Sequence, residues 1–146
     1  MTYNPMQNLA EFHDKFDRGG KARHERAISI FDVRKRMELI DEEFKEVMEE
    51  LREYEYRMLY PEEFDEWGPE NPNSVELAKE LADLLYVVYG TAEELHIPLQ
   101  EVFQAVHESN MSKVWDDGEV HYNEIGKVLK PPTYTPPDIG KILYDQ

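Results

Sequence analysis

Apolar residues recur along the chain at steps of three and four, the period of an amphipathic helix. The longest such pattern runs from about Asp32 to Tyr56 and is bordered on both sides by charged residues. Its apolar positions are Met37, Ile40, Phe44, Val47 and Leu51. This stripe predicts one long helix with a single side facing the core.

Three further segments predict helices. The first covers roughly Met6 to Phe16 and precedes a Gly-Gly pair, and another spans about Pro98 to Lys113. Between them, a segment from Asn73 or Ser74 to about His96 has a middle, Leu81 to Tyr89, that is apolar on nearly all sides. A helix with this composition is expected to be central and covered on most of its circumference.

The chain after Lys113 differs in composition. Trp115 to Gln146 holds two Pro-Pro pairs and the glycines Gly118 and Gly126, among others, which predicts an irregular but ordered tail with a short hairpin around Val120 to Leu129. At 146 residues, one domain is the expectation for the whole chain. We therefore predict an all-α fold, a bundle of four to five helices over about 6–113 followed by an irregular tail over about 115–146.

Charge and cysteine usage exclude several classes of function. The formal net charge is −16, which disfavours nucleic acid and anionic membranes as partners. The chain has no cysteine, so disulfides, zinc–thiolate sites and thiol nucleophiles are excluded. Neither a signal-like N-terminus nor a long apolar run is present, and a cytoplasmic protein is the expectation. A phosphorylated small molecule remains a possible substrate, because a bound Mg²⁺ ion reverses the local field of an acidic site.

Carboxylates are the candidate metal ligands. Glu43 and Glu46 are three residues apart on the second predicted helix, and Glu80 and Asp83 repeat this spacing on the third. If the two helices pack antiparallel, all four converge, and Asp83 stands in an apolar stretch where desolvation is costly without a cation. Hard oxygen ligands suit Mg²⁺, for which Mn²⁺ can substitute. The alternative is that these acids are solvated, as is common on an acidic helix.

Polar and aromatic residues elsewhere are candidates for substrate binding. Asn110 and Lys113 continue the inner stripe of the fourth predicted helix, where Lys113 could hold a phosphate or simply favour the helix C-terminus. Lys127 and Lys130 in the tail are open to the same two interpretations. Four residues could stack on a base, although core packing is the more common role for the two phenylalanines. They are Phe12, His13, Phe16 and Trp67.

Three strings carry a resemblance to a known family. Leu39–Glu46, Glu80–Gly90 and Val106–Lys113 resemble the MazG-like all-α nucleoside-triphosphate pyrophosphohydrolases, whose relatives include dimeric dUTPases and phosphoribosyl-ATP pyrophosphohydrolase. The family signature is EExxE followed, after a loop, by ExxD. Its positions here are Glu42, Glu43, Glu46, Glu80 and Asp83.

The resemblance implies a bundle of the MazG-like type and hydrolysis of a nucleoside triphosphate to the monophosphate and pyrophosphate, with water attacking the α-phosphorus. It implies Mg²⁺ ligands at Glu43, Glu46, Glu80 and Asp83, and a role for Glu42 in orienting or deprotonating the water. It also implies a homodimer or homotetramer and, as a cellular role, house-cleaning of the nucleotide pool. The preferred base stays open.

Two other interpretations fit parts of the sequence. A diiron bundle uses two Glu-x-x-His pairs, and only Glu93 with His96 forms one. His96 is better explained as a residue at a helix end. An acidic helical interaction protein without catalysis accounts for the charge but leaves Asp83 unexplained.

Overall fold

The computed structural model describes residues 3–17, 25–63 and 73–145, with the side chain of Asn73 left out. The described chain is all helical, as predicted, and no β-strand occurs within these ranges. It divides into two compact units, Met1–His96 and Ile97–Gln146. The fourth helix therefore groups with the tail, whereas the sequence placed it with the helical core. None of the described helices combines the length and apolar character that a membrane span requires.

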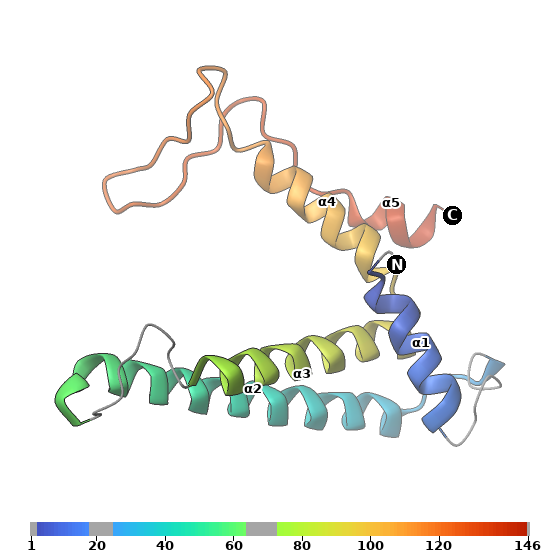
Figure 1. The fold of residues 1–146 in the computed structure, drawn as a ribbon. Helices are drawn as coiled ribbons and strands as arrows, with labels where there is room; N and C mark the ends of the chain where they lie inside the picture. Colours follow the sequence, from blue (N-terminus) through green and yellow to red (C-terminus); the bar gives the residue numbers. More distant parts are fainter. Residues whose placement is uncertain (1–2, 18–24, 64–72, 146) are drawn as a thin grey trace. The chain divides into compact units, whose positions relative to one another are not determined.

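The first unit is built around two long helices, α2 (Ile30–Leu59) and α3 (Asn73–Glu94), which run side by side in opposite directions (Figure 1). A short 3₁₀ helix, η2 (Pro61–Glu63), follows α2. Helix α1 (Pro5–Phe16) packs against α3. The antiparallel packing on which the predicted convergence of carboxylates depends is present, and it brings the middle of α2 opposite the middle of α3.

Local signals in the sequence explain where these helices begin. Asn4 caps α1 by accepting a hydrogen bond from the backbone N–H of Gln7 at 3.1 Å, and Pro5 occupies the first turn. Ser29 and Asp32 form a capping box at the start of α2, with Asp32 also bound by Arg26 at 2.8 Å. This capping box starts α2 two residues before the predicted Asp32.

The inward side of α2 differs from the predicted stripe. Val47 is buried and Ile40 is half-buried, as expected, but the side chains of Met37 and Phe44 are 65% and 51% exposed. Arg36 is buried in place of Met37, because α3 covers a side of α2 that is rotated away from part of the apolar stripe.

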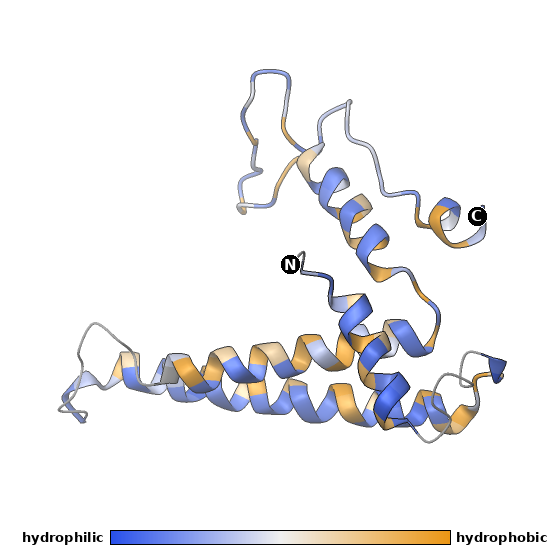
Figure 2. Cartoon of the chain, turned by 45° about the vertical axis from the view of Figure 1, so that its right-hand side comes forward, coloured by the Kyte–Doolittle hydropathy of each residue, from blue (hydrophilic) through white to orange (hydrophobic). Residues whose placement is uncertain are grey.

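Helix α3 is less covered than its sequence predicts. Leu81, Leu85 and Tyr86 are all more than two-fifths exposed, because α1 and α2 cover only part of its circumference. Figure 2 shows hydrophobic stretches along both α2 and α3. Apolar surface on both long helices is therefore available for a partner.

Helix α3 closely approaches α1 and α2 near Gly90. A Cβ atom at this position would lie 2.9 Å from Nη1 of Arg36 and 3.4 Å from Nε2 of His13. The absence of a side chain thus allows a buried arginine and a buried histidine to lie against the α3 backbone.

The second unit contains α4 (Leu99–Met111), the tail and a short helix, α5 (Ile139–Tyr144), that packs against α4. The predicted hairpin is present as one antiparallel bridge between Tyr122 and Val128. Gly126 allows the turn, with a φ of 80°. Helix α5, which Asp138 caps, was not among the helices predicted by range.

Candidate metal and substrate site

Three carboxylates meet between the long helices of the first unit. Glu43 and Glu46 lie one turn apart on α2, and Glu80 lies on α3 opposite them. One oxygen from each residue lies within 4.8 Å of the others. The i, i+3 spacing places the first two on one flank of α2, and the antiparallel packing adds the third. The structure thus brings together three of the four predicted ligands.

The negative charge of this group of three carboxylates is only partly compensated by hydrogen-bond donors of the described residues. Oε2 of Glu43 and Oε2 of Glu80 are buried and have no hydrogen-bond partner among the described residues. Burial, and then the charges of Glu43 and Glu80, raise the pKa of Glu46 above its usual value. Carboxylate oxygens that are buried, close together and without a donor fit a divalent cation such as Mg²⁺ or Mn²⁺, which accepts this ligand type.

Asp83, the fourth predicted ligand, has a different environment from the one expected. Its side chain is 43% exposed, and it accepts a hydrogen bond from Nζ of Lys79 at 2.8 Å. Lys79 also binds Oε1 of Glu80 at 3.0 Å, and these two bonds raise the pKa of Lys79. The expected desolvation of Asp83 is therefore wrong, because the outer side of α3 is open and a lysine one turn earlier reaches the carboxylate.

Glu42, the predicted water-orienting residue, is exposed on α2, next to Glu43 in sequence. Adjacent residues on a helix project about 100° apart, so Glu42 projects in a direction different from that of Glu43. Its role in catalysis stays a prediction.

A cavity in the first unit lies along the same helix pair. Its volume is about 280 Å³, and Phe12, Arg36 and Tyr86 are among the residues that line it. Arg36 precedes Glu43 by seven residues, or about two helical turns. The cavity and the carboxylates therefore occupy neighbouring stretches of the α2–α3 pair.

Phe12 and His13, the predicted base-binding residues, both line this cavity. Phe12 stacks on Phe16 with ring centroids 4.5 Å apart and meets Tyr86 edge-on at 5.4 Å. The side chain of His13 is only 2% exposed, and its Nδ1 lies 2.5 Å from Oε2 of Glu93. His13 thus already has a buried partner. Phe16, a further candidate, is largely exposed, so its expected core packing is wrong, and Trp67 lies outside the described residues.

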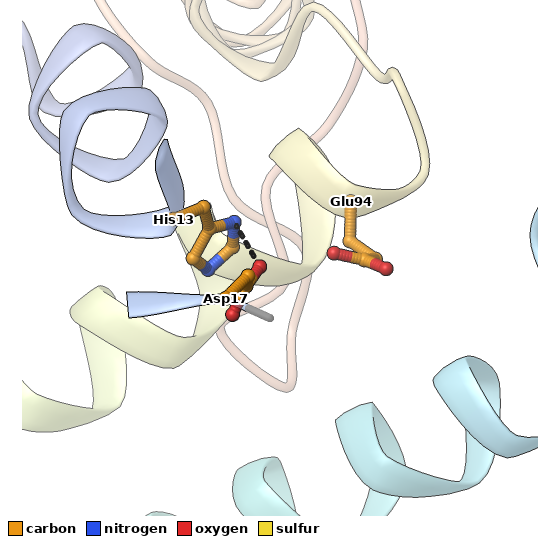
Figure 3. A group of neighbouring side chains, drawn as sticks. All are labelled: His13, Asp17 and Glu94. Atoms are coloured by element: carbon orange, nitrogen blue, oxygen red, sulfur yellow. Dashed lines mark ion pairs between the residues drawn. The ribbon is translucent and has the colours of Figure 1, made fainter. Parts of the chain in front are cut away.

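A second group with metal-ligand spacing consists of His13, Asp17 and Glu94 (Figure 3). Nδ1 of His13 lies 3.9 Å from Oδ2 of Asp17, and Oε1 of Glu94 lies 3.5 Å from Nη2 of Arg26. Because His13 and Arg26 already provide partners for these acids, the group has the character of an ion-pair network.

The suggested Glu93–His96 iron ligands are not supported by this geometry. Glu93 binds His13, and His96 lies two residues beyond the last residue of α3, with a φ of 55°. His96 is therefore a residue beyond the helix end, as the sequence indicated.

The remaining predicted substrate-binding residues all lie in the second unit. Nζ of Lys113 donates to Oδ1 of Asn110 at 2.8 Å at the end of α4. Lys127 lies in the hairpin turn, where its backbone N–H donates to Asn123. Nζ of Lys130 lies 4.5 Å from the ring centroid of Tyr134. The sequence did not single out Tyr134, because only the folded tail brings it to α4.

Comparison with known proteins assigns the family. The sequence model of the phosphoribosyl-ATP pyrophosphohydrolase family matches residues 9–110, which include all of α2, α3 and the three grouped carboxylates. The search of curated proteins finds no match to the chain. The chain belongs to the phosphoribosyl-ATP pyrophosphohydrolase family, part of the MazG-like all-α superfamily, as its resemblance indicated. Membership implies a hydrolase that releases pyrophosphate from a nucleotide.

Proposed function

We propose that this member of the family hydrolyses a nucleoside or deoxynucleoside triphosphate to the monophosphate and pyrophosphate in a Mg²⁺-dependent reaction. The observation that carries the proposal is a pair of buried oxygens, one on Glu43 of α2 and one on Glu80 of α3, that have no hydrogen-bond partner among the described residues and belong to one group of three carboxylates. Mg²⁺, when bound, supplies positive charge for the phosphate chain and the departing pyrophosphate.

The residues have distinct proposed roles. Glu43, Glu46 and Glu80 would hold the metal, and Asp83, which now accepts a hydrogen bond from Lys79, would be the fourth ligand. Glu42 accepts a proton from the attacking water. The water oxygen forms a bond to the α-phosphorus, the bond from that phosphorus to the bridging oxygen breaks, and pyrophosphate leaves with the bonding electrons.

Other side chains are proposed to hold the substrate. Phe12 and the other residues that line the cavity contact the base. His13 also lines this cavity, and its bond to Glu93 fixes the orientation of its ring. Four residues of the second unit stay candidates for substrate binding, as the sequence predicted: Asn110, Lys113, Lys127 and Lys130. The cellular role that suits this reaction is house-cleaning of the nucleotide pool.

We further propose that the chain works as a homodimer or homotetramer. Large apolar side chains recur every seven residues along α2, and all five are exposed. They are Ile30, Met37, Phe44, Leu51 and Met58. A row with this period matches the seam of paired helices, and burying it against a second copy removes apolar surface from water.

Mg²⁺-dependent thermal stability tests the metal assignment directly. Mg²⁺ together with a non-hydrolysable nucleoside triphosphate is expected to raise the melting temperature of the wild type, because ligands that bind only the folded state stabilise it. The Glu80→Gln variant is expected to lose most of this shift. A wild type that is indifferent to Mg²⁺ and releases no pyrophosphate from any natural or oxidised triphosphate would instead be a non-catalytic acidic interaction protein.

A further inference from the structure

Arg36 is a buried cation whose charge the described residues do not compensate. Its side chain on α2 is only 7% exposed, and across residues 3–17, 25–63 and 73–145 it takes part in no hydrogen bond and no ion pair. Glu93, the buried acid of the same unit, is bound by Nδ1 of His13 instead. The guanidinium therefore keeps its N–H donors available.

The other arginines in the described ranges are paired or exposed. Arg26 and Arg57 each form an ion pair with a carboxylate, at 2.8 and 2.7 Å. Arg34 and Arg52 are exposed, so water solvates their charge. Burying an unpaired guanidinium is costly, and positions that break such a rule are expected at functional sites. This combination of burial and missing partner singles out Arg36 as a ligand-binding residue.

Arg36 lines the cavity of about 280 Å³ in the first unit, and the rest of the lining is mainly apolar. Phe12 and Tyr86 provide aromatic surface, and Leu39 and Val87 provide aliphatic surface. Pockets for drug-sized ligands begin at about 300 Å³, so this volume suits one planar ring rather than a whole nucleotide. The cavity thus favours a flat ring that carries hydrogen-bond acceptors on one edge.

A free inorganic anion fits this cavity less well than a neutral ring. It would leave the apolar lining without a partner, and Asp17, which also lines the cavity, would repel it. The guanidinium is therefore expected to meet neutral acceptors.

The position of the guanidinium limits which edge of a ring can reach it. Nη1 of Arg36 would lie 2.9 Å from a Cβ atom at Gly90, so it lies directly against the backbone of α3. A base whose sugar stays outside can reach this depth only with the edge that is far from the sugar. The planar guanidinium presents two parallel N–H donors to such an edge.

We propose that Arg36 selects a 6-oxopurine as the base of the substrate by donating to O6 and N7 together. Guanine and hypoxanthine present these two acceptors side by side, whereas adenine presents one acceptor and an amino donor. Cytosine also has two adjacent acceptors, but one of them, O2, lies beside the bond to the sugar. The role as a substrate base rests on the proposed function, whereas the uncompensated guanidinium in an apolar cavity does not.

Binding of neutral deoxynucleosides to the full chain, followed by two-dimensional amide NMR without metal, tests the selection. Deoxyguanosine is expected to shift residues around 12–13, 36 and 86–90. Deoxyadenosine and deoxycytidine are expected to bind about 10- to 100-fold more weakly, as for the loss of a bidentate contact. 7-Deazadeoxyguanosine, which lacks only the N7 acceptor, is expected to bind about tenfold more weakly. Deoxyinosine separates the two bases: equal binding assigns the site to both, and weaker binding assigns it to guanine.

Variants at position 36 then connect the selection to the guanidinium. Arg36→Met is expected to remove the preference for deoxyguanosine and to keep or raise the melting temperature, because it deletes an unpaired buried charge. Arg36→Lys keeps the charge without the fork and is expected to lose the preference as well. The matched controls Arg34→Met and Arg34→Lys change an exposed arginine of the same helix and should retain it.

Turnover gives an independent measurement. Arg36→Met is expected to lower kcat/KM for dGTP about 10- to 100-fold and to leave kcat/KM for dATP within about threefold. The proposal is overturned if the wild type binds deoxyadenosine or 7-deazadeoxyguanosine as tightly as deoxyguanosine. It is also overturned if Arg36→Lys binds all nucleosides like the wild type, or if Arg36→Met weakens all of them equally. Failure of the metal assignment is distinguishable, because neutral nucleosides need no Mg²⁺ and full turnover in Glu80→Gln would leave their binding unchanged.

Discussion

Two groups of acidic side chains on the same helix pair differ in what neutralises them. Near the end of α3, Glu93 is bound by His13 at 2.5 Å and Glu94 lies 3.5 Å from Arg26. In the middle of the pair, Glu43 and Glu80 each keep a buried oxygen that has no hydrogen-bond partner in the described part of the chain. Both groups include a trio with the spacing of metal ligands, yet among the described residues only the second keeps buried carboxylate oxygens that no donor reaches, although Lys79 binds the other oxygen of Glu80.

The difference shows that the number of acids does not by itself identify a metal site. Burying a charge is costly unless the protein or a ligand compensates it. Where the fold places a histidine or an arginine beside the acids, their charge is compensated and the pairs stabilise the fold. Where buried carboxylate oxygens are left without a donor, as in the second group, an external cation can compensate them, and this separates the two groups in experiments.

Glu80→Gln should give the largest effect. Loss of one metal ligand removes several kcal/mol of transition-state stabilisation, so pyrophosphate release should fall by about 10³-fold or more. The matched variant Glu94→Gln changes an acid of the group near the end of α3, which His13 and Arg26 neutralise. It should keep turnover within about threefold of the wild type. Equal losses in the two variants, measured per folded molecule, would remove the distinction between the groups.

His13→Ala should mainly reduce stability. It removes a buried partner of Glu93 and should lower the free energy of unfolding by about 3 kcal/mol in urea titrations. His121 provides a control, because it pairs with Asp117 at 2.7 Å on the surface of the second unit. His121→Ala should change stability much less. A similar small change in His13→Ala would contradict a structural role for the His13–Glu93 pair.

Phe44→Glu should weaken the proposed assembly. With half of each Phe44 side chain exposed, losing its burial in two copies costs about 2 kcal/mol, or about 30-fold in the dissociation constant. Sedimentation velocity measures this change, and Phe31→Glu is the control because Phe31 is exposed on α2 but lies outside the seven-residue row. A monomeric wild type at all working concentrations would refute the assembly.

Lys79→Gln should produce the smallest effect. Lys79 holds Asp83 and Glu80, so it competes with a cation for both carboxylates. Its removal should tighten Mg²⁺ binding about threefold by calorimetry, a modest change because the ammonium group is exposed. Weaker Mg²⁺ binding in this variant would indicate that Lys79 supports the metal site.

The helices could be predicted from the sequence because their signals are local. Asn4 and Pro5 mark the start of α1, and proline, glycine and asparagine mark the connections. The orientation of α2 could not be predicted, because an apolar stripe does not reveal which neighbour covers it. Met37 is exposed while Arg36 is buried, since only the packing against α3 determines the inward side.

In the candidate site, too, the features set by spacing along one helix could be predicted, whereas the features set by packing between distant segments could not. The spacing of Glu43 and Glu46 follows from one helix, and the contribution of Glu80 follows once the two helices are antiparallel. The exposure of Asp83 could not be read from its apolar neighbours, because it depends on which side of α3 is covered. Tyr134 reaches Ser109 across 25 residues, a contact that no short-range pattern predicts.

Gly90 limits how this sequence can diverge. Any side chain there would meet the guanidinium of Arg36 at 2.9 Å, so positions 36 and 90 are expected to vary together. Alanine at 90 should be tolerated best when residue 36 is shortened, and poorly when arginine is kept. In a library that randomises both positions, surviving clones should therefore pair a larger residue at one with a smaller residue at the other.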